Sequence, residues 1–323
     1  MAAEKNPTDS APAIVAWIDH LDHVSLRQLR KAVGLGSWEH TRVSELYREV
    51  LPGPISQEDE EAFFCAVTLC AACKPAKEAN RSFACQLGAA DQARQFTDFL
   101  AHILDISSMP LLASQIVHGI RFLNSRKKYL DRTRLVRDIL AWSQEERTVQ
   151  QSWAKEFSSQ VSSLDQEMED PVRGFLSSVQ QMEEVKKEAF RSAPAESLRR
   201  SNGMALIGFY SALPEKVAPE EEPLFYLVAA LSLLNEEPAF PCRDLGASLQ
   251  MVCTQENEEY LSGIMAEVIQ GERSEIFPLL VKSVIYLRNL HVGFCAEKLL
   301  NDLLFWDHPA RSVQAAWEKS FFG

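Results

Sequence analysis

The chain has 323 residues, of which 46% are hydrophobic, and its formal net charge is −12. The first 160 residues hold 19 Lys and Arg against 20 Asp and Glu, and the remainder holds 14 against 25, so the balance is −1 and then −11. This argues against a free-standing DNA-binding domain, which is expected to be basic. The sequence contains no run of about 18 uncharged apolar residues, which a membrane-spanning helix needs. Its start lacks the basic flank and the apolar segment of a signal peptide. We therefore expect no membrane partner.

Helical patterns follow one another through the first half of the chain, and we find no alternating pattern long enough for a strand. Ser56, with Asp59 three residues later, predicts the N-cap of a long apolar helix that runs through Cys73, before Pro75. Apolar spacing predicts further helices over residues 14–21, 24–33, 41–50, 92–104 and 110–124. We therefore expect an all-α fold.

One segment occurs twice. Residues 134–157 read RLVRDILAWSQEERTVQQSWAKEF and residues 298–321 read KLLNDLLFWDHPARSVQAAWEKSF, which agree at ten of 24 positions without a gap. Ordinary composition would give about one or two matches. Apolar residues at helical spacing flank a short polar break in each copy, which predicts a helical hairpin. The paired tryptophans, Trp142/Trp306 and Trp153/Trp317, could stack on bases, but their periodicity favours packing across the hairpin.

Shorter matches keep the same order along the chain. They pair residues 25–28 with 197–200, 48–52 with 210–214, 64–73 with 225–234, 87–89 with 245–247 and 120–121 with 287–288. This order predicts two tandem homologous helical bundles. We expect a first copy over residues 12–158, a polar linker over 159–174 and a second copy over 175–323.

The cysteines Cys65, Cys70 and Cys73 have a spacing that resembles an iron–sulfur motif. Cys70 and Cys73 also have the spacing of a redox pair. Both interpretations need an irregular loop or a preceding strand, whereas these residues lie in an apolar helical pattern, so we expect buried thiols. Seven cysteines, an odd number, fit a reducing cytoplasm better than a disulfide framework.

Asp19, His20, Asp22 and His23 could hold a surface metal ion, but on a short amphipathic helix such residues are more often a solvated face. We find no phosphate-binding glycine loop, nucleophile motif or dinucleotide fingerprint. We therefore expect no catalytic residue, metal, cofactor or small-molecule substrate, and a protein that is not an enzyme.

Basic residues recur at several helix ends in this acidic chain. Arginines at such places often contact only solvent or nearby acids, so their recurrence alone does not establish contact with nucleic acid. The candidates for nucleic-acid contact are Arg27, Arg30, Lys31, Arg121, Arg126, Lys127, Lys128, Arg199, Arg200 and Arg288.

Four motifs together suggest a family. They are the LR-x-LR helix at Leu26–Arg30, the pair Leu287–Arg288, the D-(I/L)-L-x-W segments ending at Trp142 and Trp306, and the W-x-K-x-F segments ending at Phe157 and Phe321. In these motifs the chain resembles the CasB family, the small subunit of the type I-E CRISPR surveillance complex Cascade. The resemblance covers nearly the full chain and is strongest at the two hairpins.

The resemblance implies an all-helical, non-enzymatic protein that contacts the backbone and large subunits of Cascade. It also implies that two copies lie side by side and help to hold the guide RNA, the target DNA and the displaced strand. A tandem duplication would supply both copies from one polypeptide. Carried over to this chain, the strand-contacting residues are Arg27, Arg30, Arg121, Arg199 and Arg288. The acidic second half departs from this expectation.

Two other hypotheses stay open. The chain could be a helical adaptor with protein partners only, using its acidic second half as the docking face. It could also be a metal- or thiol-dependent enzyme, which metal analysis and an absorption spectrum would test.

Overall fold

The structure is a computed structural model. It describes residues 10–35, 43–51, 56–75, 80–90, 96–161, 170–193, 195, 197–237 and 242–323. These parts of the chain form eighteen α-helices and no strand, so the prediction of an all-α fold is confirmed. None of the helices in the described ranges is long and apolar enough to cross a bilayer.

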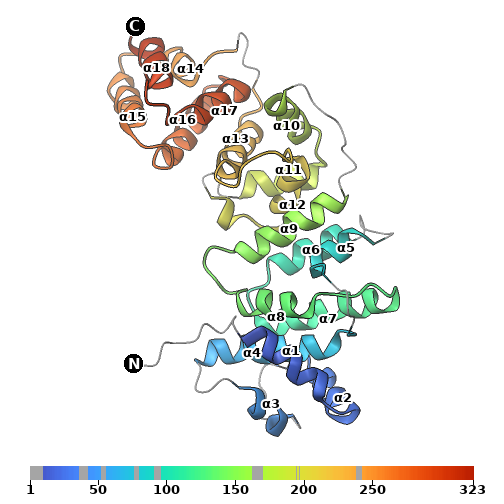
Figure 1. Ribbon diagram of the computed structural model, residues 1–323. Coiled ribbons are helices and arrows are strands. Elements are labelled where there is room, and N and C mark those ends of the chain that lie inside the picture. The colour runs from blue at the N-terminus through green and yellow to red at the C-terminus, as the bar shows by residue number, and fades with distance from the viewer. Residues whose placement is uncertain are drawn as a thin grey trace. The chain divides into compact units, whose positions relative to one another are not determined.

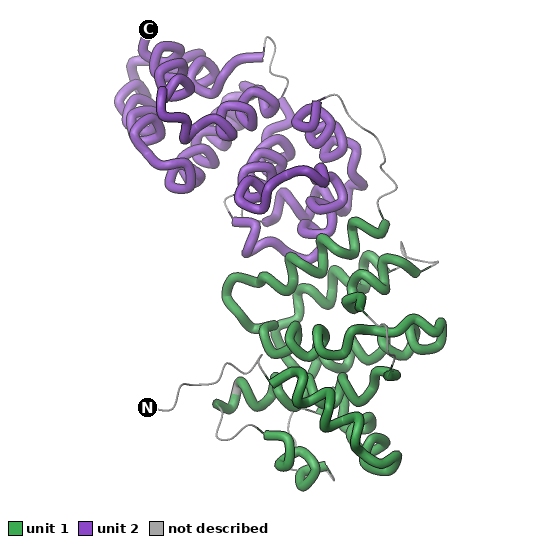
Figure 2. Tube along the Cα trace, in the orientation of Figure 1, with its two compact units in different colours: residues 1–163 green, residues 164–323 purple. Residues whose placement is uncertain are grey.

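The chain divides into two compact units, residues 1–163 and residues 164–323 (Figure 2). In unit 1 the α-helices are α1 Ala11–His20, α2 His23–Lys31, α3 Ser44–Val50, α4 Gln57–Ala72, α5 Phe83–Gly88, α6 Thr97–Leu104, α7 Met109–Ser125, α8 Arg132–Leu140 and α9 Thr148–Val161 (Figure 1). In unit 2 they are α10 Pro171–Gln180, α11 Glu184–Ser192, α12 Gly203–Ala212, α13 Glu222–Leu234, α14 Leu245–Gln250, α15 Glu258–Gln270, α16 Phe277–Asn289, α17 Ala296–Leu304 and α18 Ser312–Phe322. A short 3-10 helix, η3, covers Leu198–Arg200.

Helices reach into both ends of the segment 159–174 that we expect to be a linker. Helix α9 continues to Val161, and α10 begins at Pro171, where the Asp170 side chain accepts hydrogen bonds from the backbone N–H groups of Val172 and Arg173. Residues 162–169 lie outside the described residues. The described parts of this polar segment are therefore helical next to each unit.

Helix α4 is the central helix of unit 1 and packs against α1, α2, α7 and α8. Residues 62–71 are all buried, as expected for a helix that is apolar on every side. The Ser56 hydroxyl accepts a hydrogen bond from the Asp59 N–H at 3.1 Å, and the helix is capped at its other end by Cys73. Both predicted ends of this helix are confirmed.

Helix α13 has the corresponding place in unit 2 and packs against α10, α11, α16 and α17. Residues 224–233 are all buried. Each unit thus has its own core, built around one apolar helix.

The hairpin of unit 1 is formed by α8 and α9. Trp142 and Trp153 are buried, with ring centroids 5.2 Å apart in an edge-to-face arrangement, so the prediction of core packing is confirmed. The Trp153 indole donates to Asp138 Oδ2 at 2.7 Å, and Gln150 Nε2 donates to the Trp142 carbonyl oxygen at 2.9 Å. Arg147, in the left-handed region at φ 51°, donates to the Leu104 carbonyl oxygen.

The hairpin of unit 2, formed by α17 and α18, repeats these contacts. Trp306 and Trp317 are buried with centroids 5.1 Å apart. Trp317 donates to Asp302 Oδ2 at 2.8 Å, and Gln314 donates to the Trp306 carbonyl oxygen at 2.7 Å. Arg311, at φ 47°, donates to the Ile269 carbonyl oxygen. Residues identical in the two copies therefore make equivalent contacts.

One of the shorter sequence matches is wrong in register. Ser82 caps α5 and donates to Glu156, while Asp244 caps α14 and accepts from Ser320 at 2.7 Å. Asp244 therefore corresponds to Ser82, which places Gly246 opposite Ala84 rather than Gly88. The Leu-Gly-Ala segments at 87–89 and 245–247 lie one helical turn apart.

The cysteines of α4 are thiols in the core, as predicted. Burial raises the pKa of Cys65 and of Cys70 to about 12, and it raises that of Cys73 as well. Against expectation, Cys242 and Cys295 form a disulfide that ties the segment before α14 to the start of α17.

Candidate nucleic-acid interface

The first group of predicted contact residues lies on α2, which is held against α4. The Asp22 side chain accepts a hydrogen bond from the Ser25 N–H at 2.8 Å and so caps α2, and Leu29 is buried. Arg27, Arg30 and Lys31 are exposed on this helix. Arg30 Nε donates to the Ala71 carbonyl oxygen at 2.6 Å, in the last turn of α4, where the helix dipole favours a cation.

The second group follows α7, which ends at the same place. Asn124 Nδ2 donates to the Ala72 carbonyl oxygen at 3.1 Å. The chain then turns through Lys127 at φ 56°, and the Lys128 N–H bonds back to the Leu123 carbonyl oxygen at 2.9 Å, which closes the helix end. The Arg126 guanidinium lies over the Phe122 ring, 5.5 Å from its centroid.

Helices α2 and α7 therefore meet at the C-terminal end of α4 and bring two predicted groups together. Arg121 lies on the exposed side of α7, one turn before Asn124. Lys74 is exposed directly after the C-cap of α4 and joins them, although no motif or repeat in the sequence marks it. We call this surface the basic face; it consists of Arg27, Arg30, Lys31, Lys74, Arg121, Arg126, Lys127 and Lys128.

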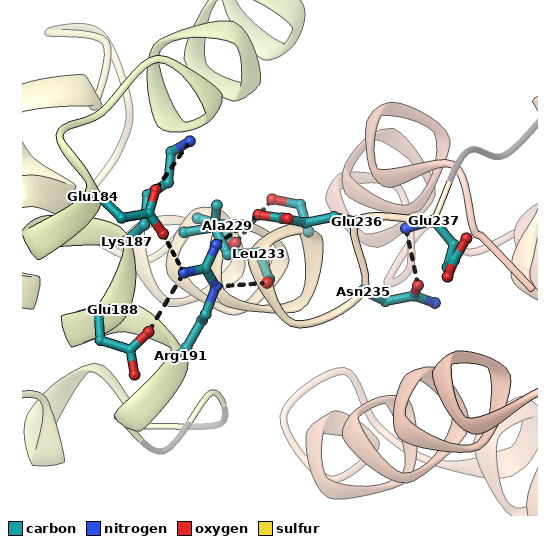
Figure 3. Close-up of polar contacts among 10 residues, drawn as sticks. Glu184, Lys187, Glu188, Arg191, Ala229, Leu233, Asn235, Glu236 and Glu237 are labelled. Atoms are coloured by element: carbon teal, nitrogen blue, oxygen red, sulfur yellow. Dashed lines mark hydrogen bonds and ion pairs between the residues drawn. The ribbon is translucent and has the colours of Figure 1, made fainter. Parts of the chain in front are cut away.

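The counterpart of Arg30 in unit 2 is Arg191, not Arg199 or Arg200. Arg191 lies on α11, which packs against α13 as α2 packs against α4, and its Nε donates to the Leu233 carbonyl oxygen at 3.3 Å. Three carboxylates surround its guanidinium (Figure 3): Glu184 at 2.5 Å, Glu236 at 2.8 Å and Glu188 at 3.4 Å. The hydrogen bond from Arg191 lowers the pKa of Glu184, and the bonds to Glu184 and Glu236 raise the pKa of Arg191.

Arg199 and Arg200 are exposed on η3, between α11 and α12. The predicted match of residues 25–28 with 197–200 is therefore wrong, because it pairs a helix with the connection that follows the equivalent helix. A gapless match of residues 23–32 with 184–193 would have found Arg191. In this match three pairs of residues are identical: Val24/Val185, Arg30/Arg191 and Ala32/Ala193.

Arg288 does not correspond to Arg121 as predicted. The Val292 N–H bonds to the Leu287 carbonyl oxygen at 2.9 Å, next to His291 at φ 55°, which repeats the end of α7 with Leu287 in the place of Leu123. Arg288 thus corresponds to Asn124. It lines a pocket with Glu188, Glu236 and Glu237, so its charge lies among carboxylates.

Three of the four residues weighed as a metal site, Asp19, His20 and Asp22, have other contacts in the fold. Asp19 pairs with Arg132 at 2.8 Å, His20 Nδ1 lies 2.7 Å from the Ala16 carbonyl oxygen, and Asp22 is the cap of α2. Within the described ranges, no group of three or more His, Cys, Asp or Glu side chains could hold a metal ion.

The basic face lies in a part of the chain with a known counterpart. Residues 25–157 match the family model of the CRISPR-associated protein Cse2. The match includes every residue of the basic face. The Cse2 family consists of non-catalytic Cascade subunits, in line with the expectation that this chain is not an enzyme.

A solved structure of CasB from Thermus thermophilus is also similar. It is 25% identical in sequence, the alignment covers 48% of this chain and 99% of that chain, and the TM-score is 0.39. A search of curated proteins gave no match.

Proposed function

We propose that this chain is a non-catalytic small subunit of a Cascade-like CRISPR effector complex. In this role it braces the guide RNA, the target DNA and the displaced strand through the basic face of unit 1. The observation that carries the proposal is the convergence of α2 and α7 at the end of α4, inside the segment that matches Cse2. The partners are the backbone and large subunits of the complex, and the compartment is the cytoplasm.

We propose further that unit 2 is a second copy of the same domain, so that one polypeptide supplies a tandem pair. The repeated hairpin contacts and the equivalent bonds of Arg30 and Arg191 support this. The copies have diverged in charge, because the end of α13 carries carboxylates where the end of α4 carries cations.

The mechanism needs no chemical step. Lys and Arg contacts to phosphates add affinity that does not depend on sequence and that falls as salt rises. The exchange of a DNA duplex for an RNA–DNA heteroduplex is nearly balanced, so a few such contacts favour the open, strand-exchanged state. Arg27, Lys31 and Arg121 suit this role because they are exposed and have no hydrogen bond or ion pair with any described residue.

Arg30 combines two roles in this proposal. Its Nε bonds to α4, while the rest of the guanidinium remains at the exposed surface. Arg199, Arg200 and Arg288 remain candidates, but we expect them to contribute less. Arg288 lies beside three carboxylates, and Arg199 and Arg200 lie on a 3-10 helix of only three residues.

A filter-binding series at increasing salt, with the full chain and a single-stranded oligonucleotide, tests the proposal. Replacing Arg27, Lys31 and Arg121 with Ala should lower the slope of log K against log salt by about 0.7 for each lost contact, or about 2 for all three. The matched triple variant, with Ala at Arg199, Arg200 and Arg288, removes the same charge and should change the slope less. An unchanged slope in the unit 1 variant would support the adaptor hypothesis instead.

A further inference from the structure

The surface of unit 2 that corresponds to the basic face has changed its chemistry. Three contacts fix the correspondence: the Arg30 and Arg191 bonds to the central helix, the C-caps Cys73 and Asn235, and the left-handed turns at Lys127 and His291. Counting from these contacts pairs Arg27 with Glu188, Lys74 with Glu236, Pro75 with Glu237, Arg121 with Ile285, Arg126 with Leu290 and Lys127 with His291.

Two of these replacements expose apolar side chains. Ile285 is 40% exposed and Leu290 is 47% exposed. Ile285 lies one helical turn before Arg288, which lines the acidic pocket, and Leu290 precedes His291, whose Nδ1 is 3.1 Å from Glu237. Ile285 and Leu290 do not line the pocket themselves, but each lies near a residue that lines it or pairs with its lining: Ile285 near Arg288 and Leu290 next to His291.

The carboxylates of this pocket are only partly neutralised. Glu184, Glu188 and Glu236 share the charge of Arg191 (Figure 3), and Arg288 is the one other cation among the described residues that line the pocket. The side chains of Glu188 and Glu236 are still 71% and 51% exposed. The second half of the chain has a balance of −11, so the surrounding field repels a polyanion and attracts a cation. A surface with exposed apolar groups beside carboxylates is suited to a protein segment and unsuited to a nucleic-acid strand.

We infer that Ile285 and Leu290, with Glu188, Glu236 and Glu237, form a docking site for a partner protein. The occupant presents apolar side chains next to Lys or Arg. Its apolar side chains cover Ile285 and Leu290, and its cation pairs with the carboxylates of the pocket. The two units then use equivalent surfaces for different partners, nucleic acid in unit 1 and protein in unit 2.

A labelled peptide of alternating Leu and Arg serves as the probe, and its fluorescence anisotropy is measured with the full chain. The double variant Ile285→Asn/Leu290→Asn and the double variant Glu236→Gln/Glu237→Gln should each weaken binding at least fivefold. The control Phe305→Asn/Phe322→Asn removes two exposed apolar side chains elsewhere in unit 2, and Glu258→Gln/Glu259→Gln removes two exposed charges. Each control should change binding less than twofold.

Equal losses of peptide binding in the docking-site variants and in the controls would overturn the inference, because they would show that the peptide is attracted by the net charge alone. Two further results would overturn it. One is a loss of oligonucleotide binding in the docking-site variants. The other is self-association of the chain, seen in sedimentation, that these variants abolish. The peptide assay does not involve the basic face, so its failure and a failure of the salt series are distinguishable.

Discussion

Asp138 is the buried carboxyl group at the centre of the first hairpin. Its Oδ2 accepts the Trp153 indole N–H at 2.7 Å and lies 3.9 Å from Arg134 Nε. Burial outweighs both interactions and raises the pKa of Asp138 to about 6. This pKa gives unit 1 a pH-dependent stability.

The predicted dependence has a defined direction. The folded-state pKa of Asp138 is above the unfolded value of about 3.9, so the folded chain binds more protons between that value and about 6. The stability from this group is fully present below this range and is lost as pH rises through it, by about 2–3 kcal/mol. Asp138→Asn should flatten this part of the curve in urea unfolding monitored by tryptophan fluorescence. Asp98→Asn, at an exposed position, is the control; a curve for Asp138→Asn parallel to the wild type would refute the assignment.

For single residues, the sequence predicts those features that follow from helical periodicity. The burial of the four hairpin tryptophans follows from their helical spacing. The bond from Arg30 to Ala71 does not, because it joins residues 41 positions apart and depends on how α2 crosses α4. The same holds for Arg191, because two of its carboxylates, Glu184 and Glu188, lie on α11 and the third, Glu236, lies in the segment after α13.

Helix pairs in each unit approach closely where a glycine permits it. In unit 2, α14 packs against α18, and a Cβ atom at Gly246 would lie 2.7 Å from the Trp317 carbonyl oxygen and 2.6 Å from Ser320 Oγ. At Gly263, on α15, a Cβ atom would meet nothing within 4 Å. The two glycines form a matched pair for a test of this packing.

Gly246→Ala should destabilise unit 2 by about 1–3 kcal/mol, since the backbone of α18 cannot move aside without loss of packing. Gly263→Ala should stabilise it by up to about 1 kcal/mol, because alanine favours an exposed helix. Urea unfolding monitored by circular dichroism measures both changes. Equal effects at the two positions would mean that α14 and α18 are not in close contact.

The elements themselves could be predicted better than their pairing. The cap at Ser56 and the end at Cys73 follow from local chemistry, and both are confirmed. The register of the weaker repeats could not be predicted, because dipeptides such as Leu-Gly and Leu-Arg recur by composition. Contacts in the structure fix which residues correspond, among them the caps Ser82 and Asp244 and the turns at Lys127 and His291.

At the scale of the whole molecule, the disulfide distinguishes the units. Cys242 and Cys295 are 53 residues apart in sequence and both belong to unit 2. In unit 1 the equivalent segments are joined by a backbone hydrogen bond from the Asp131 N–H to the Arg81 carbonyl oxygen at 3.0 Å. The cysteine count did not reveal this cross-link, because an odd number of cysteines does not indicate which of them form a disulfide.

Removing the disulfide should therefore affect unit 2 alone. In the variant Cys242→Ser/Cys295→Ser, the free energy of unfolding of unit 2 should fall by about 2–4 kcal/mol. Dithiothreitol should lower the melting temperature of the wild type but not that of the variant. Hydrogen exchange resolves the two units: protection should fall in α14 and α17, and α4 should be unchanged. Equal loss of protection in α4 would contradict independent cores.

The central claim is that nucleic acid contacts the surface where α2 and α7 meet the end of α4. Photo-cross-linking of the assembled complex, loaded with guide RNA and target DNA that carry 4-thio-pyrimidines, tests it most directly. We predict that mass spectrometry finds adducts on peptides spanning residues 27–31 and 121–128, and far fewer on residues 184–193 or 285–292. Adducts concentrated on those unit 2 peptides, with the basic face unmodified, would contradict the account.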